Sequence, residues 1–190
     1  AKAEFVNNIV VNGNERVSSE TIILLGGIEK DKEYTDTILN NIINELYEIG
    51  KDIKLSDNII ECFIELKKIC ASKNIKLEIY VISVGLKTLI EGAIDGATKK
   101  LGIKENPIDG IYAGEISPNP FNNNKLETIS VIEDYSKTEI AYEISKGGQS
   151  NRDKKIARGE YVIPHNKFIV LGDGFSDIPM FRFFRYVGGI

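Results

Sequence analysis

The sequence predicts an α/β fold with a mostly parallel sheet, and three observations support this prediction. Two β-rich apolar runs, at 75–83 and 168–171, each lead through a glycine into a helical pattern. The second run is continuously apolar, which suits a strand covered on both faces in a parallel sheet. Both runs end in polar side chains, as expected where open α/β sheets bind ligands. We therefore expect a three-layer, Rossmann-like body.

Bulk composition limits the function classes. The 190 residues, with 42% hydrophobic content, are enough for a sizeable core. A net charge of −4 and a pI near 5.2 argue against a nucleic-acid partner, because binding phosphate backbones requires positive charge. The longest apolar runs are too short to cross a bilayer, so we predict no membrane span.

Two carboxylates, Asp173 and Asp177, follow the apolar run at 168–171. Gly172 and Gly174 free the backbone beside Asp173, and a helical turn near Ser176 would bring Asp177 to the same point. A few hard oxygen ligands near a phosphate site favour Mg²⁺, which keeps several waters and binds through one or two carboxylates. The alternative is a solvated Asp-Gly turn.

A candidate phosphate site follows the run at 75–83. Ser83 ends that run, Gly85 follows, and a helical pattern extends from Leu86 to Leu101. A hydroxyl and outward-facing backbone N–H groups at a helix start favour an anion. The alternative role of Ser83 is a helix cap.

A cationic side chain, Lys137, lies near the start of a predicted helix over 134–147 and is a further candidate for the phosphate site. A cation there opposes the helix dipole, so another interaction should account for its position. The alternative is an exposed surface lysine.

These residues occur in the order of motifs two, three and four of the haloacid dehalogenase-like (HAD) phosphatase superfamily. The phrases Val81-Ile-Ser-Val-Gly-Leu-Lys87 and Val170-Leu-Gly-Asp-Gly-Phe-Ser-Asp-Ile-Pro-Met-Phe181 make the chain from about 55 to 190 resemble its phosphoserine-phosphatase-like branch. The resemblance implies a phosphomonoester hydrolase acting on a small phosphorylated substrate. It implies phosphate binding by Ser83, Gly85 and Lys137, a catalytic role for Lys137, and Mg²⁺ held by Asp173 and Asp177.

The first motif of that family, Asp-x-Asp-x-Thr/Val with the nucleophilic aspartate, is not found in this sequence. The nearest approximation, Asp31-Lys-Glu33, follows an apolar run that stops at Gly26-Gly27. We therefore expect a body without its first strand, shortened at its C-terminus, and catalytically impaired for lack of the attacking carboxylate.

The first 53 residues resemble a different family. Phe5–Val11 alternates as a strand, Ser18 and Ser19 begin a helix, and 35–49 repeats apolar residues at helical spacing. With Asn12-Gly-Asn at the turn, this order resembles the β-α-α part of a POTRA repeat of outer-membrane assembly factors. The resemblance implies capture of a β-strand peptide by edge addition.

The two resemblances predict a division into 1–53 and 54–190, with a join near 50–54. The longer body implies the cytoplasm, and the POTRA-like segment would imply the periplasm. A fusion or truncation product without its own activity is the remaining alternative.

The other expectations concern single elements. Strand-like runs at 111–116 and 128–132 flank a turn-rich connector and predict a β-hairpin, and 58–72 predicts a helix. Cys62 and Cys70 fit neither a zinc site nor a disulfide, so we predict buried reduced thiols. His165 follows Pro164 in a predicted loop, with no sequence pattern that supplies a Ser or Cys partner.

Overall fold

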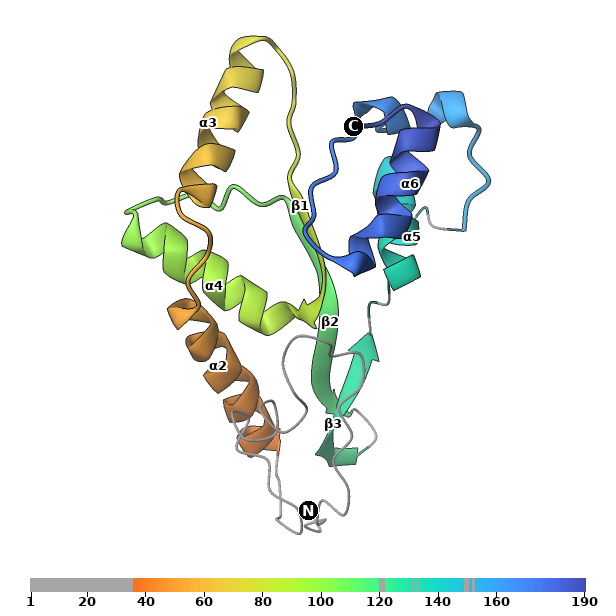
Figure 1. Cartoon of the computed structure of the whole chain (residues 1–190). Coiled ribbons are helices and arrows are strands. Elements are labelled where there is room, and N and C mark those ends of the chain that lie inside the picture. Colours follow the sequence, from red (N-terminus) through yellow and green to blue (C-terminus); the bar gives the residue numbers. More distant parts are fainter. Residues whose placement is uncertain (1–35, 120–121, 131, 133, 149–150, 152) are drawn as a thin grey trace. The chain divides into compact units, whose positions relative to one another are not determined.

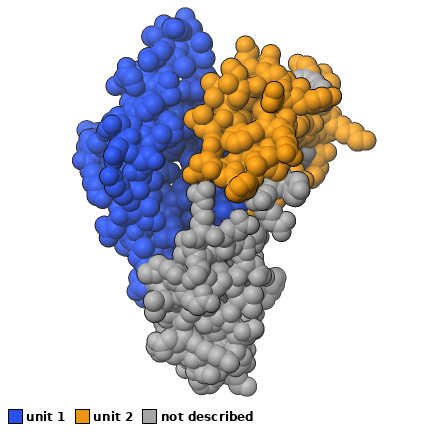
Figure 2. Space-filling model, viewed as in Figure 1, with its two compact units in different colours: residues 1–131 blue, residues 132–190 orange. Residues whose placement is uncertain are grey.

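The computed structural model describes residues 36–119, 122–130, 132, 134–148, 151 and 153–190. The chain divides into two compact units, Ala1–Val131 and Ile132–Ile190, and each is considered by itself (Figure 2). The POTRA-like strand at 5–11, the helix start at Ser18 and the tripeptide at Asp31 lie outside the described residues. The peptide-binding prediction therefore falls largely outside them too.

The first unit is mixed α/β (Figure 1). Its sheet has the order β1-β2-β3, with β1 and β2 parallel and β2 and β3 antiparallel. The predicted α/β class is confirmed at this level, and the predicted helices lie within about three residues of their expected bounds. The elements are α2 (Asp36–Asp52), α3 (Ile59–Ser72), β1 (Tyr80–Leu86), α4 (Lys87–Lys100), β2 (Gly110–Asn119) and β3 (Asn122–Ser130).

Strand β1 begins later than the predicted run at 75–83 and ends at Leu86. Its partner β2 begins only at Gly110, which pairs with Tyr80, so no ladder partner exists for the preceding residues among those described. The Asp109 carboxylate accepts the Ile79 N–H at 2.7 Å, and the Asp109 N–H donates to the Ile79 carbonyl at 2.8 Å. These two hydrogen bonds join the segments that lead into β1 and β2, just before the ladder begins.

The predicted β-hairpin is confirmed as β2 and β3. The strands reach further into the connector than expected, because Ser117 pairs with Glu127 and Asn119 with Asn122. The turn-rich composition marked the connector correctly. Backbone pairing nevertheless extends through most of it.

Helix α2 packs closely on α4 within the first unit. Ile42 and Leu46 of α2 are buried, with Leu86, Leu89 and Ile116 packed against them. Residues before the predicted join near 50–54 thus share a core with residues after it, and the boundary between compact units lies at 131/132.

Both cysteines lie on α3 and are free thiols. Cys62 is exposed and Cys70 is partly exposed, so the prediction of buried thiols is wrong. The reason is that α3 buries little of its surface: Ile60 is its only buried residue. None of the helices in the described part of the chain combines the length and apolarity needed to cross a membrane.

The second unit joins two α-helices through short 3-10 turns (Figure 1). Pro179 stands in the first turn of its second α-helix, and Gly188, with φ of 88°, ends that helix in the left-handed conformation that suits glycine. The elements are α5 (Asp134–Ser145), η2 (Arg158–Glu160), η3 (His165–Lys167), η4 (Phe175–Asp177) and α6 (Ile178–Val187).

The apolar run at 168–171 is extended but is not a strand buried on both faces. Ile169 and Leu171 are 68% and 80% exposed, which corrects the prediction of a covered strand. The Val170 N–H donates to the Ile190 carbonyl at 2.7 Å, and the Ile190 N–H donates to the Phe168 carbonyl at 3.0 Å. This is the hydrogen-bond pattern of a parallel pair, so the chain returns alongside its own extended run after α6.

Candidate functional site

A buried ion pair joins α5 to the start of α6. Lys137 lies in the first turn of α5 and is 4% exposed. Its Nζ donates to Asp177 Oδ1 at 2.6 Å and to Ser176 Oγ at 2.8 Å. The alternative of an exposed surface lysine is therefore wrong, and the Asp177 carboxylate explains a cation near this helix start.

Asp177 is held by the turn that precedes it. Its second carboxylate oxygen, Oδ2, accepts the Gly174 N–H at 3.0 Å. Burial raises the pKa of this carboxyl, but the hydrogen bonds from Lys137 and from the Gly174 backbone outweigh burial, so the pKa lies below its ordinary value. The carboxylate is thus charged, buried and bonded at both oxygens.

Gly172 is required by this arrangement for reasons of space. A Cβ placed on Gly172 would lie 2.5 Å from Asp177 Oδ2 and 2.6 Å from its Cγ. The sequence predicts that Gly172 and Gly174 free the backbone beside Asp173. The structure gives a more specific reason for glycine at 172, which is that its backbone lies against the Asp177 carboxyl.

Asp173, the other predicted metal ligand, follows the extended run and is exposed. Asp177 is the last residue of the η4 turn, which begins two residues after Asp173, so both carboxyls belong to one short segment. Within the described residues, no group of three or more His, Cys, Asp and Glu side chains could hold a metal ion. A metal here would have at most this pair of carboxylates from the described chain.

Ser83 and Gly85, the predicted phosphate ligands, lie in β1 of the first unit. The regular pairing of β1 with β2 is interrupted between Ile82 and Leu86, so both residues lie where the ladder is irregular. Ser83 Oγ accepts the Gly85 N–H at 3.0 Å. No side chain caps the start of α4, so Ser83 stabilises a local turn and does not have the alternative role of a helix cap.

One further cation lies at this strand end. Lys87, the first residue of α4, pairs with Glu115 of β2 at 2.5 Å, in partly buried surroundings. Of the five predicted site residues, Lys137 and Asp177 are in direct contact and Asp173 shares the loop of Asp177. Ser83 and Gly85 belong to the other unit.

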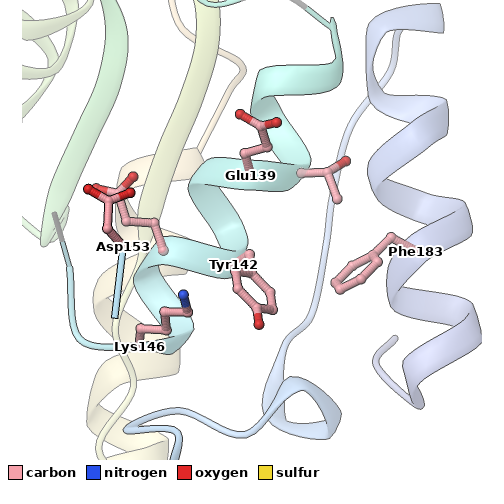
Figure 3. A pocket seen from close by; sticks show the side chains of 7 residues that line it. Glu139, Tyr142, Lys146, Asp153 and Phe183 are labelled. Atoms are coloured by element: carbon pink, nitrogen blue, oxygen red, sulfur yellow. The ribbon is translucent and has the colours of Figure 1, made fainter. Parts of the chain in front are cut away.

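Sequence reasoning missed a cleft on α5 of about 370 Å³ (Figure 3). Threonine, tyrosine and lysine side chains spaced by four residues line it, which is the spacing of one helix face. That spacing was the available signal. The lining residues are Thr138, Glu139, Tyr142, Glu143, Lys146, Asp153 and Phe183.

Sequence reasoning also missed a partner of His165. Ser145 Oγ lies 3.1 Å from His165 Nε2, although the two residues are 20 positions apart. Ser145 is 0% exposed and its hydroxyl donates to the Tyr142 carbonyl at 2.5 Å. The Ser145 hydroxyl is therefore not accessible as a nucleophile. The hydrogen-bonded pair forms part of the buried interior of the second unit.

A comparison with known proteins shows a similarity over most of the chain. The chain is 28% identical, over 180 residues, to a protein of Borreliella burgdorferi strain B31 that is described as an uncharacterized protein. The match covers 90% of this chain and 62% of that relative, so the chain spans less than two thirds of the relative's length. No family model matches the chain, and no solved structure matches it.

Proposed function

We propose that this chain carries the phosphate- and Mg²⁺-binding residues of a HAD-like phosphomonoester hydrolase with a Rossmann-like body. The observation that carries the proposal is the buried contact of Lys137 with Asp177 and Ser176, at 2.6 and 2.8 Å. A buried cation fixed beside a carboxylate and a hydroxyl is an arrangement that can stabilise the charge of a transferring phosphoryl group. The parallel pairing of 168–170 with Ile190 is consistent with the α/β body of such an enzyme.

Lys137 has a donor left for a phosphate oxygen. A lysine ammonium has three N–H groups, and Asp177 Oδ1 and Ser176 Oγ accept two of them. The remaining N–H is held in one direction, because two acceptors and burial restrain the side chain. Such a preorganised donor stabilises negative charge without reorganising when the substrate binds.

The two carboxylates fit Mg²⁺ in number and in kind. Asp173 and Asp177 would hold the ion, and Asp177 already accepts hydrogen bonds at both of its oxygens. Mg²⁺ commonly keeps several waters and takes one or two carboxylates together with substrate phosphate. The bound ion would supply further positive charge to offset that of the phosphate.

Ser83 and the start of α4 supply the donors of the first unit. The Ser83 hydroxyl accepts from Gly85, which leaves its own proton for a phosphate oxygen. The uncapped N–H groups of α4 favour an anion nearby. Lys87 offsets the negative charge of Glu115 at the same strand end.

The attacking carboxylate has no counterpart in the sequence, so we propose binding with little or no turnover. Removing a covalent nucleophile leaves only what electrostatic stabilisation and binding provide. The similarity to one relative covers 90% of the chain, so it includes residues on both sides of position 53. This favours one shared architecture over a chance fusion. On the HAD resemblance we place the protein in the cytoplasm.

Titration calorimetry with Mg²⁺ in the presence of inorganic phosphate tests this proposal. Asp173→Asn should abolish Mg²⁺ binding while leaving the ion pair intact, and Asp153→Asn, another exposed aspartate of the same unit, is the matched control. Hydrolysis of an aryl phosphate should be negligible for all three proteins. Equal Mg²⁺ affinity in wild type and Asp173→Asn would refute the metal site, and robust Asp173-dependent turnover would show that a nucleophile exists.

A further inference from the structure

Helix α3 is held on the first unit by little buried surface. Ile60, at 2% exposed, is its only buried residue, and its main neighbour among the described elements is α4 (Figure 1). Half-buried side chains follow Ile60 at the spacing of one helix face, so this face is the one turned toward the unit. Little apolar surface is thus fully removed from water beneath the helix. The half-buried residues of this face are Phe63, Ile64, Lys67 and Cys70.

The chain bends sharply at both ends of α3. Asn58 before the helix and Asn74 after it have left-handed φ values of 61° and 57°, and no other non-glycine residue in the described part of the chain has a positive φ. The Ile75 N–H donates to the Cys70 carbonyl at 2.9 Å. The Asn74 N–H donates to the Ala71 carbonyl at 3.0 Å. These two bonds form a Schellman motif, so the C-terminal end of α3 is closed by its own backbone.

One ion pair ties the middle of α3 to the sheet. Lys67 Nζ lies 2.6 Å from Asp109 Oδ2, and the two side chains are 28% and 32% exposed. The same carboxylate oxygen accepts the Ile79 N–H at 2.7 Å. Ile79 and Asp109 directly precede β1 and β2, so the ion pair fixes α3 at the point where the ladder begins.

The neighbouring lysines have other partners. Lys76 pairs with Glu78, and Lys68 lies 3.9 Å from Glu65 of its own helix. Within the described residues, the Lys67 ammonium is the cation that lies within ion-pair distance of Asp109. The attachment of α3 to the sheet therefore depends on a single charged contact together with a thin apolar face.

We propose that α3 is a hinged arm of the first unit, which pivots about Asn58 and Asn74 and is latched to the sheet by the ion pair of Lys67 with Asp109. Removing a partly exposed ion pair changes an equilibrium by up to about fivefold. Because little else holds the helix, a change of this size shifts the balance between docked and undocked arm. Salt screens partly exposed charges, so the undocked fraction rises with ionic strength.

The two cysteines of the chain report the position of the arm. Both lie on α3, where Cys62 is exposed and Cys70 is partly covered. Undocking should uncover Cys70 and leave Cys62 as it was. Maleimide labelling of the full chain, followed by trypsin digestion and mass spectrometry, measures the two rates separately, because Lys67 and Lys68 lie between the two thiols.

Lys67→Met should raise the labelling rate of Cys70 by about two- to fivefold and leave that of Cys62 unchanged. Asp109→Asn should act in the same direction, although it alters no residue of α3 and keeps an acceptor for the Ile79 N–H. Lys68→Met is the matched control and should label as wild type does.

Ionic strength provides a readout that needs no variant. Raising NaCl from about 0.01 to about 1 M should speed Cys70 labelling in wild type and have little effect in Lys67→Met, where the latch is already lost. The proposal is overturned if neither variant speeds Cys70 labelling, if Cys62 accelerates in parallel, as it would if the helix unfolded, or if salt acts equally on wild type and Lys67→Met.

Discussion

Gly50 of α2 and Gly92 of α4 face each other with no room for a side chain between them. A Cβ on Gly92 would lie 2.9 Å from the Gly50 Cα and 2.2 Å from the Tyr47 carbonyl oxygen. Gly96, one turn further along α4, is equally close to the backbone of Lys51, at 2.4 Å from its carbonyl oxygen. Two glycines four residues apart therefore set how closely these helices pack.

Gly92→Ala should destabilise the first unit by about 1–3 kcal/mol, the usual cost of overpacking a tight contact. Chemical denaturation measures this change. Gly159→Ala is the control, because a Cβ there meets nothing within 4 Å, and it should be neutral or slightly stabilising. Equal stability of Gly92→Ala and wild type would mean that α2 and α4 do not pack this closely.

Loss of one member of the buried ion pair should cost more than loss of both. Lys137→Met or Asp177→Leu leaves an uncompensated buried charge and should destabilise the second unit by about 3–5 kcal/mol. The double variant leaves no charge and should recover a substantial part of that loss. Denaturation of the four proteins forms a double-mutant cycle, and strictly additive effects would argue against the contact.

Asp177 predicts a loss of stability at acid pH. Its pKa is lowered in the folded state, so its stabilising contribution is fully present above the unfolded pKa of about 4 and is lost as pH falls through the folded value. Asp177→Asn should therefore lose stability at neutral pH and show a flatter stability profile below about pH 4. If stability below about pH 4 depended on pH in this variant as it does in wild type, other carboxylates would be responsible for the transition.

Gly172→Ala should disturb the site without removing a polar group. The added Cβ would overlap the Asp177 carboxyl, at 2.5 Å from Oδ2, and should displace it from Lys137 or from the Gly174 N–H. We expect Mg²⁺ affinity to fall and the ion pair to weaken, as measured by calorimetry and denaturation. Gly159→Ala should again match wild type.

The exposed face of the run at 168–171 should tolerate polar residues. Leu171→Ser removes a side chain that is 80% exposed and should change stability by no more than about 0.5 kcal/mol. Phe184→Ala, at a position 1% exposed, should cost about 3–5 kcal/mol. A large loss of stability in Leu171→Ser would indicate that this face is covered, as the sequence alone predicted.

The sequence was most informative where structure depends on near neighbours. The apolar spacing in 35–49, 58–72 and 86–101 predicted α2, α3 and α4 to within a few residues, because helix amphipathicity is a local property. The β-rich runs around turn residues likewise predicted the β2–β3 hairpin. Lys137 and Asp177 were selected as site residues from a motif order, and the structure brings them together.

Properties that depend on distant residues could not be predicted. The start of β1 depends on where β2 begins, and the exposure of Leu171 depends on which layers cover it. The contact of Ser145 with His165 joins residues 20 positions apart, and no spacing rule connects them. Gly92 and Gly96 are spaced by four residues, which is visible in the sequence. That Gly92 lies against Gly50 depends on how α2 and α4 cross, which the sequence does not reveal.

The hydrogen bonds between Ile190 and the run at 168–170 turn the intervening chain into a closed loop. The acidic turn with Asp173 and Asp177 lies inside that loop and is anchored on both sides. If the residues beyond Gly188 frayed, these hydrogen bonds would be lost and the loop would no longer be closed. The two carboxylates would then sample more orientations. Order at the acidic turn is thus linked to a contact made beyond α6.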